Sequence, residues 1–175
     1  CVSWFLPPAA STSTPTGEDV AAELKPYYGQ VLTWSSCGGG MQCATAKAPM
    51  DWSDPSAGDI ELALVRQPAT SGNRVGSLLV NPGGPGFGGT DFAIYAEQVY
   101  NEPLLEAFDI VGWDPRGTGL SEPAIDCIDD YDRFFGSLDI TPDDEAERTE
   151  IADMAQQFAD ECAADGVRMN NVLPG

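Results

Sequence analysis

The sequence predicts an α/β protein, because two apolar segments and the helical pattern between them form a strand, helix, strand unit. Residues 75–80 and 108–113 are near-continuous apolar runs bounded by Gly or Pro, as expected of parallel strands covered on both faces. Residues 90–100 have helical spacing and predict a right-handed crossover between the strands. Residues 44–52 and 59–67 are expected to form an antiparallel hairpin before this unit, so the predicted sheet is mixed.

Local signals define the remaining strands and the first helix. From Ile60 to Leu64, apolar residues occupy every second position, the period of a strand with one buried face. A further strand is expected over residues 30–35. Thr16, with an acidic residue three positions later, resembles a capping box and predicts a short helix that Pro26 ends.

A second helix is predicted to begin at Thr141, with a proline and three acidic residues in its first turn, and to stop at Gly166. Its expected buried stripe consists of Ile151, Met154, Ala155, Phe158 and Cys162.

The chain has 175 residues, with 28 acidic and 8 basic side chains and a formal net charge of −20. Such a charge opposes binding to nucleic acid or to anionic membrane surfaces. Most of the excess lies between Glu122 and Asp165, where 15 acidic residues accompany only Arg133 and Arg148. A solvated helical face that favours solubility explains this excess more simply than a binding site does.

Five cysteines lie at positions 1, 37, 43, 127 and 162, with no Cys-x-x-Cys pair and no histidine to complete a zinc site. Disulfides in an exported protein fit this pattern, and reduced thiols in a cytosolic protein are the alternative. Cys37 and Cys43 flank three glycines and are expected to pair. Cys127 and Cys162 then form the second pair, which leaves Cys1 over. No metal or other cofactor is expected.

The first 16 residues are expected to form a flexible tether, because residues 7–16 are rich in Pro, Ala, Ser and Thr. A lipid-bearing Cys1 followed by such a tether is the arrangement of a processed bacterial lipoprotein, and an arbitrary fragment start is the alternative. The predicted location is secreted or on the outer face of the bacterial cell membrane, with membrane contact only through that lipid.

Two glycine-containing loops follow the two parallel strands. Residues 81–89 read NPGGPGFGG, a rigid turn that leaves backbone N–H groups free to point at a ligand. Residues 114–121 read DPRGTGLS and lie at the edge of the sheet where ligands of open α/β sheets bind. Asp114 and Arg116 are expected to hold the second loop through bonds to the backbone, with substrate contact as the alternative. A phosphate loop would require a Gly-Lys-Ser/Thr ending, which is absent.

The combination of these two motifs strongly resembles the α/β-hydrolase fold. More narrowly, it is similar to the secreted tripeptidyl aminopeptidases among the proline iminopeptidase-like serine peptidases. The resemblance extends from about residue 27 to residue 162 and predicts the N-terminal half of that fold. Residues 17–175 would then be an incomplete domain, because the Gly-x-Ser-x-Gly elbow, the catalytic His and the cap are not found in them.

The resemblance implies that a backbone N–H of Gly84, with Gly83 as the runner-up, belongs to the oxyanion hole. The alternative is that these glycines serve only a tight turn. The implied activity is that of a serine exopeptidase, which releases short peptides from protein N-termini through an acyl-enzyme. Residues 1–175 alone should be inactive. An esterase or lactonase of the same fold and a non-catalytic envelope binding module are the rivals.

Overall fold

The computed structural model describes residues 10–84, 86–124, 128–136 and 139–164. The described residues divide into two compact units, 10–124 and 128–164. The first unit contains the sheet and both glycine loops. The second unit is helical in its described part.

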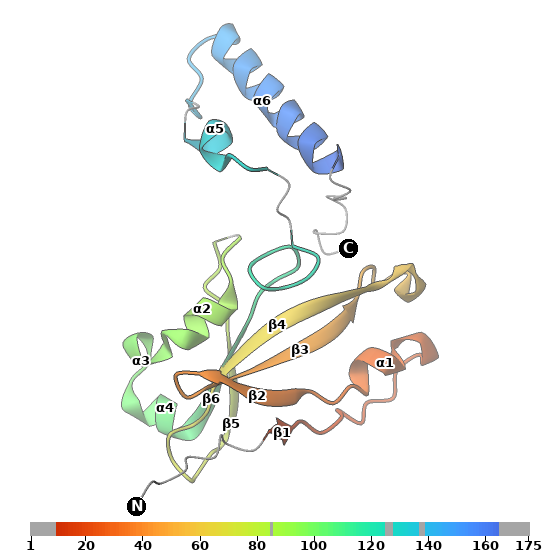
Figure 1. The fold of residues 1–175 in the computed structure, drawn as a ribbon, viewed down its shortest axis with the longest axis vertical. Coiled ribbons are helices and arrows are strands. Elements are labelled where there is room, and N and C mark those ends of the chain that lie inside the picture. The colour runs from red at the N-terminus through yellow and green to blue at the C-terminus, as the bar shows by residue number, and fades with distance from the viewer. Residues whose placement is uncertain (1–9, 85, 125–127, 137–138, 165–175) are drawn as a thin grey trace, which may run out of the picture. The chain divides into compact units, whose positions relative to one another are not determined.

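The sheet of the first unit has six strands in the order β1-β2-β3-β4-β6-β5 (Figure 1). These strands are β1 Ser11–Thr12, β2 Thr33–Gly38, β3 Met41–Pro49, β4 Asp59–Gln67, β5 Gly76–Val80 and β6 Phe108–Trp113. All neighbouring pairs are antiparallel except β5 and β6, which are parallel. A mixed sheet with an antiparallel β3–β4 hairpin is therefore confirmed. Ser11 and Thr12, within the segment expected to be a tether, pair with β2.

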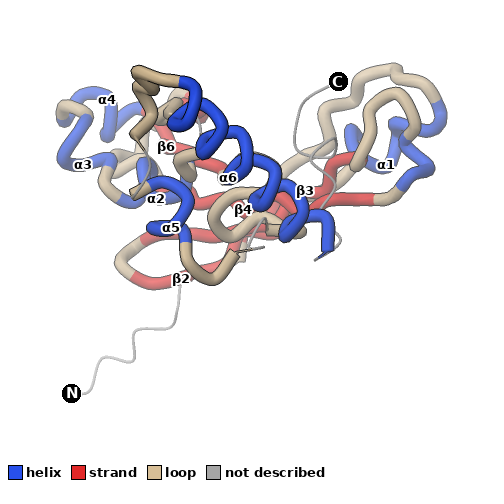
Figure 2. The backbone as a smooth tube through the Cα atoms, turned by 90° about the horizontal axis from the view of Figure 1, so that it is seen from above, coloured by secondary structure: helices blue, strands red, loops and turns tan. Residues whose placement is uncertain are grey.

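Three short helices connect β5 to β6, where the sequence predicted one. They are α2 Gly89–Ile94, α3 Ala96–Val99 and α4 Glu102–Ala107. The backbone of Tyr95 leaves helical geometry between α2 and α3, at φ −93° and ψ 17°. Asn101 caps α4 by accepting a hydrogen bond from the Leu104 N–H at 3.4 Å, a start signal that the sequence reading missed. Both views show these helices beside β6 (Figure 1 and Figure 2).

The main core lies between the sheet and α2 and α3. It consists of Val65, Val80, Ala93, Ala96 and Ile110. The alternation of buried and exposed residues that was predicted for β4 does not continue through its second half. Val65 and Gln67 are buried although they lie on the face opposite Ile60, because α2 packs against β4.

The two parallel strands differ in how they are covered. β6 has four consecutive buried residues, as predicted for a strand covered on both faces. The same prediction for the β5 region is wrong, since Leu79 is 64% exposed and Val75 is 72% exposed. β5 is the last strand of the sheet. Within the described residues, only its face towards α2 is covered.

The first helix also differs from the prediction. The structure has a 3-10 turn at Ala22–Leu24 and a short helix α1 at Lys25–Tyr28. Pro26 lies in the first turn of α1, where its missing N–H costs nothing, so it opens this helix and does not end the earlier one. The Thr16 hydroxyl donates to the Tyr28 carbonyl at 3.2 Å instead of capping a helix. A second 3-10 turn, Pro55–Ala57, connects β3 to β4.

In the second unit, α5 Tyr131–Phe135 precedes the 20-residue helix α6 Glu145–Ala164. α6 begins four residues after the predicted Thr141, because Asp144 caps it and accepts hydrogen bonds from the N–H groups of Ala146 and Glu147 at 2.8 and 3.0 Å. The predicted stop, Gly166, lies outside the described residues.

The small core of the second unit consists of Ile128, Phe134 and Cys162, with Met154 and Phe158 packed against it. The predicted buried stripe is therefore confirmed only in part. Cys162 is buried, Ile151, Met154 and Phe158 are half-buried, and Ala155 is exposed. Among the described residues, no helix combines the length and apolar content needed to cross a membrane.

Candidate functional site

The two glycine loops leave the same edge of the sheet, because each follows the carboxyl end of a strand in the parallel pair β5 and β6 (Figure 1). The 81–88 loop runs from β5 into α2, and the 114–121 loop follows β6. This edge is where ligands of open α/β sheets bind.

The first loop requires glycine at three positions. Gly83, Gly84 and Gly86 have φ values of 78°, 130° and 94°, a region that side chains make costly. The Gly83 N–H donates to the Asn81 side-chain oxygen at 2.8 Å and is already engaged. The N–H of Gly84 has no hydrogen-bond partner among the described residues, and Gly84 is exposed. Of the two donors that the sequence singled out, Gly84 is therefore the one whose N–H is not engaged by a described residue.

Asp114 joins the two loops. Its side chain is 1% exposed, and one carboxylate oxygen accepts hydrogen bonds from the N–H and the hydroxyl of Thr90 at 3.0 and 2.8 Å. The other oxygen accepts from the Leu120 N–H at 2.8 Å. The sequence predicted that Asp114 would bond to its own loop, but the bonds to Thr90, 24 positions earlier, could not be read from local pattern. Thr90 stands at the start of α2, where a carboxylate is also favoured by the helix dipole.

Close backbone packing accompanies these bonds. A Cβ atom on Gly88 or Gly119 would collide with the Asp114 carboxylate, and one on Gly112 would collide with the backbone of Gly89. The Ser121 hydroxyl donates to the Asp114 carbonyl at 2.6 Å and accepts from the Ala63 N–H of β4 at 2.9 Å. The second loop is thereby fixed to the sheet as well as to the first loop.

Arg116 connects the second loop to the end of β3. Its guanidinium donates to the Met50 carbonyl at 2.7 Å. The hydroxyl of Ser53 donates to the neighbouring carboxylate of Asp51 at 2.6 Å. That bond lowers the pKa of Asp51, with smaller contributions from backbone N–H groups and the positive charge of Arg116. On the described part of the chain, Arg116 thus binds a backbone carbonyl, that of Met50.

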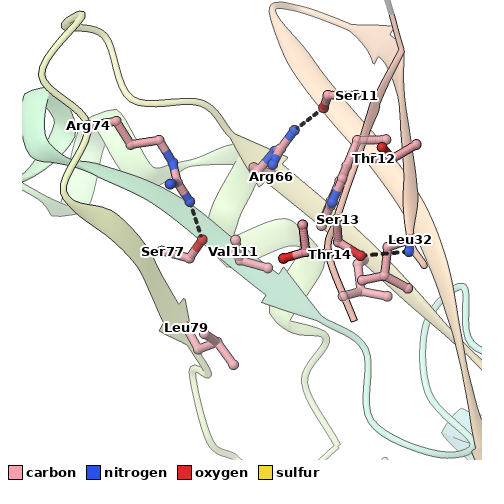
Figure 3. Close-up of a pocket in the computed structure, with 12 residues that line it drawn as sticks. Ser11, Thr12, Ser13, Thr14, Leu32, Arg66, Arg74, Ser77, Leu79 and Val111 are labelled. Carbon is pink, nitrogen blue, oxygen red and sulfur yellow. Dashed lines mark hydrogen bonds between the residues drawn. The ribbon is translucent and has the colours of Figure 1, made fainter. Parts of the chain in front are cut away.

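A separate pocket of about 540 Å³ opens along β1, β2, β4, β5 and β6 (Figure 3). Arg66 and Arg74 line it, and both contact the buried carboxylate of Asp109, at 3.5 and 2.7 Å. Burial lowers the pKa of Arg66, while the negative charge of Asp109 opposes this. Arg66 also donates to Ser11, and Arg74 to Ser77. None of the described residues of the 81–89 loop lines this pocket, which therefore differs from the candidate oxyanion site in the residues that form it.

The cysteines follow the prediction where the structure describes them. Cys37 and Cys43 form a disulfide with a Cα–Cα distance of 5.8 Å at the end of the β2–β3 hairpin. Cys162 is buried and disulfide-bonded. Its predicted partner, Cys127, and the predicted lipid carrier, Cys1, lie outside the described residues. Among the described side chains, no three His, Cys, Asp or Glu residues are grouped as metal ligands would be.

The chain is similar to bacterial hydrolases over part of its length. It is 40% identical over 121 residues to the serine protease Hip1 of Mycobacterium tuberculosis, covering 64% of this chain and 23% of that protein. It is 40% identical over 126 residues to carboxylesterase B of the same organism, covering 69% and 24%. It is 32% identical over 142 residues to the tripeptidyl aminopeptidase of Streptomyces coelicolor, covering 75% and 26%.

No protein-family model matches the chain. The chain spans about a quarter of the length of the curated relatives that it matches. These similarities support a relationship to serine hydrolases. Two of the three relatives are named as peptidases and the third as an esterase.

Proposed function

We propose that this chain belongs to a longer serine exopeptidase that releases short peptides from protein N-termini through an acyl-enzyme. In this enzyme, the N–H of Gly84 is one donor of the oxyanion hole. The observation that carries the proposal is the unpartnered Gly84 N–H on an exposed loop whose neighbouring donor, Gly83, is already bonded to Asn81. An oxyanion hole requires such a donor, held in place before the substrate arrives.

The nucleophile and the base must come from outside this chain. The sequence contains no histidine, and none of its serines lies in a Gly-x-Ser-x-Gly elbow. A serine is a weak nucleophile without an adjacent base, so residues 1–175 alone are expected to be inactive. The first experiment is therefore made on the whole protein. A fluorophosphonate probe should label it, and the isolated 175-residue chain should remain unlabelled.

Substrate panels then separate the two hydrolase activities. Peptidyl p-nitroanilides of one to four residues, each with a free and with a blocked amino terminus, test the exopeptidase. We expect cleavage of free tripeptidyl anilides and little cleavage of their blocked forms. Cleavage of p-nitrophenyl esters without any cleavage of anilides would favour the esterase or lactonase, for which the carboxylesterase relative is the supporting observation. Absence of both activities and of labelling would favour a binding module.

The role of Gly84 needs a change that removes its N–H without moving the loop. Proline does not meet this requirement, because its φ is fixed near −65° whereas Gly84 has φ 130°. Replacing Gly84 by glycolic acid exchanges only the amide for an ester. We expect kcat to fall by about 100-fold or more, the usual effect of losing one oxyanion donor. The same exchange at Gly83 should have a much smaller effect, and the exposed Gly86 is the matched control.

We further propose that the protein is exported, either secreted or held on the outer face of the cell membrane by a lipid on Cys1. The Cys37–Cys43 disulfide supports export, because disulfides persist in oxidising compartments. Fractionation of the producing cells, followed by intact-mass analysis of the N-terminal peptide, tests both parts. Recovery of the protein from the cytosol with free thiols would contradict them.

A further inference from the structure

One large apolar side chain lies directly beside the candidate oxyanion donor. A Cβ atom built on Gly84 would collide with the Phe87 ring and lie 3.3 and 3.4 Å from two further ring carbons. The Phe87 ring therefore occupies the space into which a side chain at position 84 would project. This contact gives a second reason, besides the positive φ, why position 84 requires glycine.

The rest of the ring is open to solvent. Phe87 is 66% exposed, although its preferred environment is a protein interior. Ligand sites combine apolar and aromatic walls with a few fixed polar groups. The Phe87 ring and the Gly84 N–H form such a pair within four residues of chain.

The backbone that follows Phe87 is held in place. The two residues after Phe87 pack tightly: Gly88 against the Asp114 carboxylate, and Gly89 against the Trp113 backbone. Thr90 is bonded to Asp114 through both its N–H and its hydroxyl. The anchored backbone fixes the position from which the Phe87 side chain projects, so less of the loop has to be ordered when a substrate binds.

We propose that Phe87 is a specificity-determining residue, whose ring contacts the acyl group of the substrate next to the scissile carbonyl. This inference rests on the proposed oxyanion role of Gly84. A carbonyl oxygen accepts a hydrogen bond at about 2.9 Å from the donor nitrogen, so its substituents lie within reach of a ring that already touches Gly84. The acyl group, which contains the scissile carbonyl, remains in the site while the acyl-enzyme forms and breaks down. The leaving group departs in the first step. The ring therefore favours substrates with large apolar acyl groups.

The test uses the whole protein and two substrate series. In the first, the leaving group is constant and the residue that carries the scissile carbonyl is Gly, Ala, Leu or Phe. In the second, the acyl group is constant and the leaving group varies in size. The variants are Phe87→Ala and Phe87→Leu. Leu79→Ala is the matched control, because Leu79 is similarly exposed but lies in β5 before the loop.

We expect Phe87→Ala to lower kcat/KM for the Leu and Phe substrates by about 10- to 100-fold, the usual range for losing an apolar contact in a specificity pocket. The Gly substrate should change by less than about 3-fold. Phe87→Leu should show an intermediate loss, and Leu79→Ala should leave the preference unchanged.

Two results would overturn the proposal. An equal loss for every acyl group would mean that Phe87 only shapes the loop, and a changed preference in the leaving-group series alone would place the ring on the other side of the scissile bond. Fluorophosphonate labelling of each variant keeps this test separate from the proposed function. If the unmodified protein is not labelled and turns over neither series, the serine hydrolase itself is rejected. If it is labelled and active but Phe87→Ala keeps the original preference, only the Phe87 proposal fails.

Discussion

The carboxylate of Asp114 binds both the backbone N–H and the hydroxyl of Thr90, at 3.0 and 2.8 Å. Asp114 follows β6 and Thr90 lies in the first turn of α2, so this pair joins the loops that leave two parallel strands. The candidate donor Gly84 is in one of these loops. The same carboxylate secures the other loop through the Leu120 N–H.

Replacing Asp114 should therefore destabilise the protein strongly. Each oxygen of the Asp114 carboxylate accepts a hydrogen bond from a backbone N–H group. Asp114→Asn replaces one of these oxygens by an NH₂ group, which leaves a buried N–H donor without an acceptor, and this is costly. We expect a loss of about 3 kcal/mol in the free energy of unfolding of the whole protein. Thr90→Val, which removes only the hydroxyl, should cost about 1 kcal/mol, and Thr90→Ser should cost less. Urea unfolding measures all three. Equal stability of Asp114→Asn and the unmodified protein would contradict this role.

Gly112→Ala tests the close approach of β6 to α2. A methyl group at this position would collide with the backbone of Gly89, which cannot move as a flexible side chain could. We expect a loss of about 3 kcal/mol, at the upper end of the usual cost of overpacking. Gly76→Ala is the matched control in β5, because a Cβ there meets nothing within 4 Å. It should be neutral or stabilising by about 0.5 kcal/mol. Similar melting temperatures for the two variants would disprove the predicted contact.

The Cys37–Cys43 disulfide should contribute modestly to stability. It joins cysteines only six positions apart, and the chain-entropy relation gives about 2 kcal/mol for so short a loop. Unfolding of the Cys37→Ser/Cys43→Ser double variant, compared with the unmodified protein, measures this contribution. A single Cys37→Ser variant controls for the substitution itself and should lose a similar amount.

The partner of Cys162 in the second disulfide remains a prediction. Cys162 is disulfide-bonded, and we expect its partner to be Cys127. Peptide mapping by mass spectrometry of unreduced protein should find the two cysteines in one cross-linked peptide. The loop between them is longer, so breaking this bond should cost about 2 to 4 kcal/mol. A free thiol at Cys127 would reject the pairing.

The exposed edge strand β5 leads us to predict that the isolated 175-residue chain associates with itself. β5 is the last strand of the sheet, and its Leu79 is 64% exposed. An apolar edge strand with unpaired backbone groups promotes association. We expect the isolated chain to bind hydrophobic dyes and to self-associate in sedimentation experiments, and Leu79→Lys to reduce both effects. Ile140→Lys, an exposed apolar residue in the other unit, is the control. A monomeric chain with a cooperative melt would contradict the prediction.

Local patterns in the sequence were sufficient for several elements. The bounds of β4 and β6 match the predicted ranges 59–67 and 108–113, because each strand is marked at its ends by turn residues and its apolar spacing is unambiguous. The three glycines between Cys37 and Cys43 likewise predicted that these cysteines pair, and the hairpin brings the two sulfurs together. Such features depend on neighbours within a few residues.

Only the tertiary structure decided which groups of the candidate site are free and which are engaged. The Gly83 N–H is bonded to Asn81, whereas that of Gly84 is not. An Asn side chain often accepts from the N–H two positions later, but only the structure shows that this bond forms here. Leu79 belongs to an apolar run like that of β6, but its exposure follows from the position of β5 at the end of the sheet. The Asp114–Thr90 bonds join residues 24 positions apart. Hydrogen-bond partners and burial at this distance depend on how the strands are ordered, which residue spacing alone does not encode.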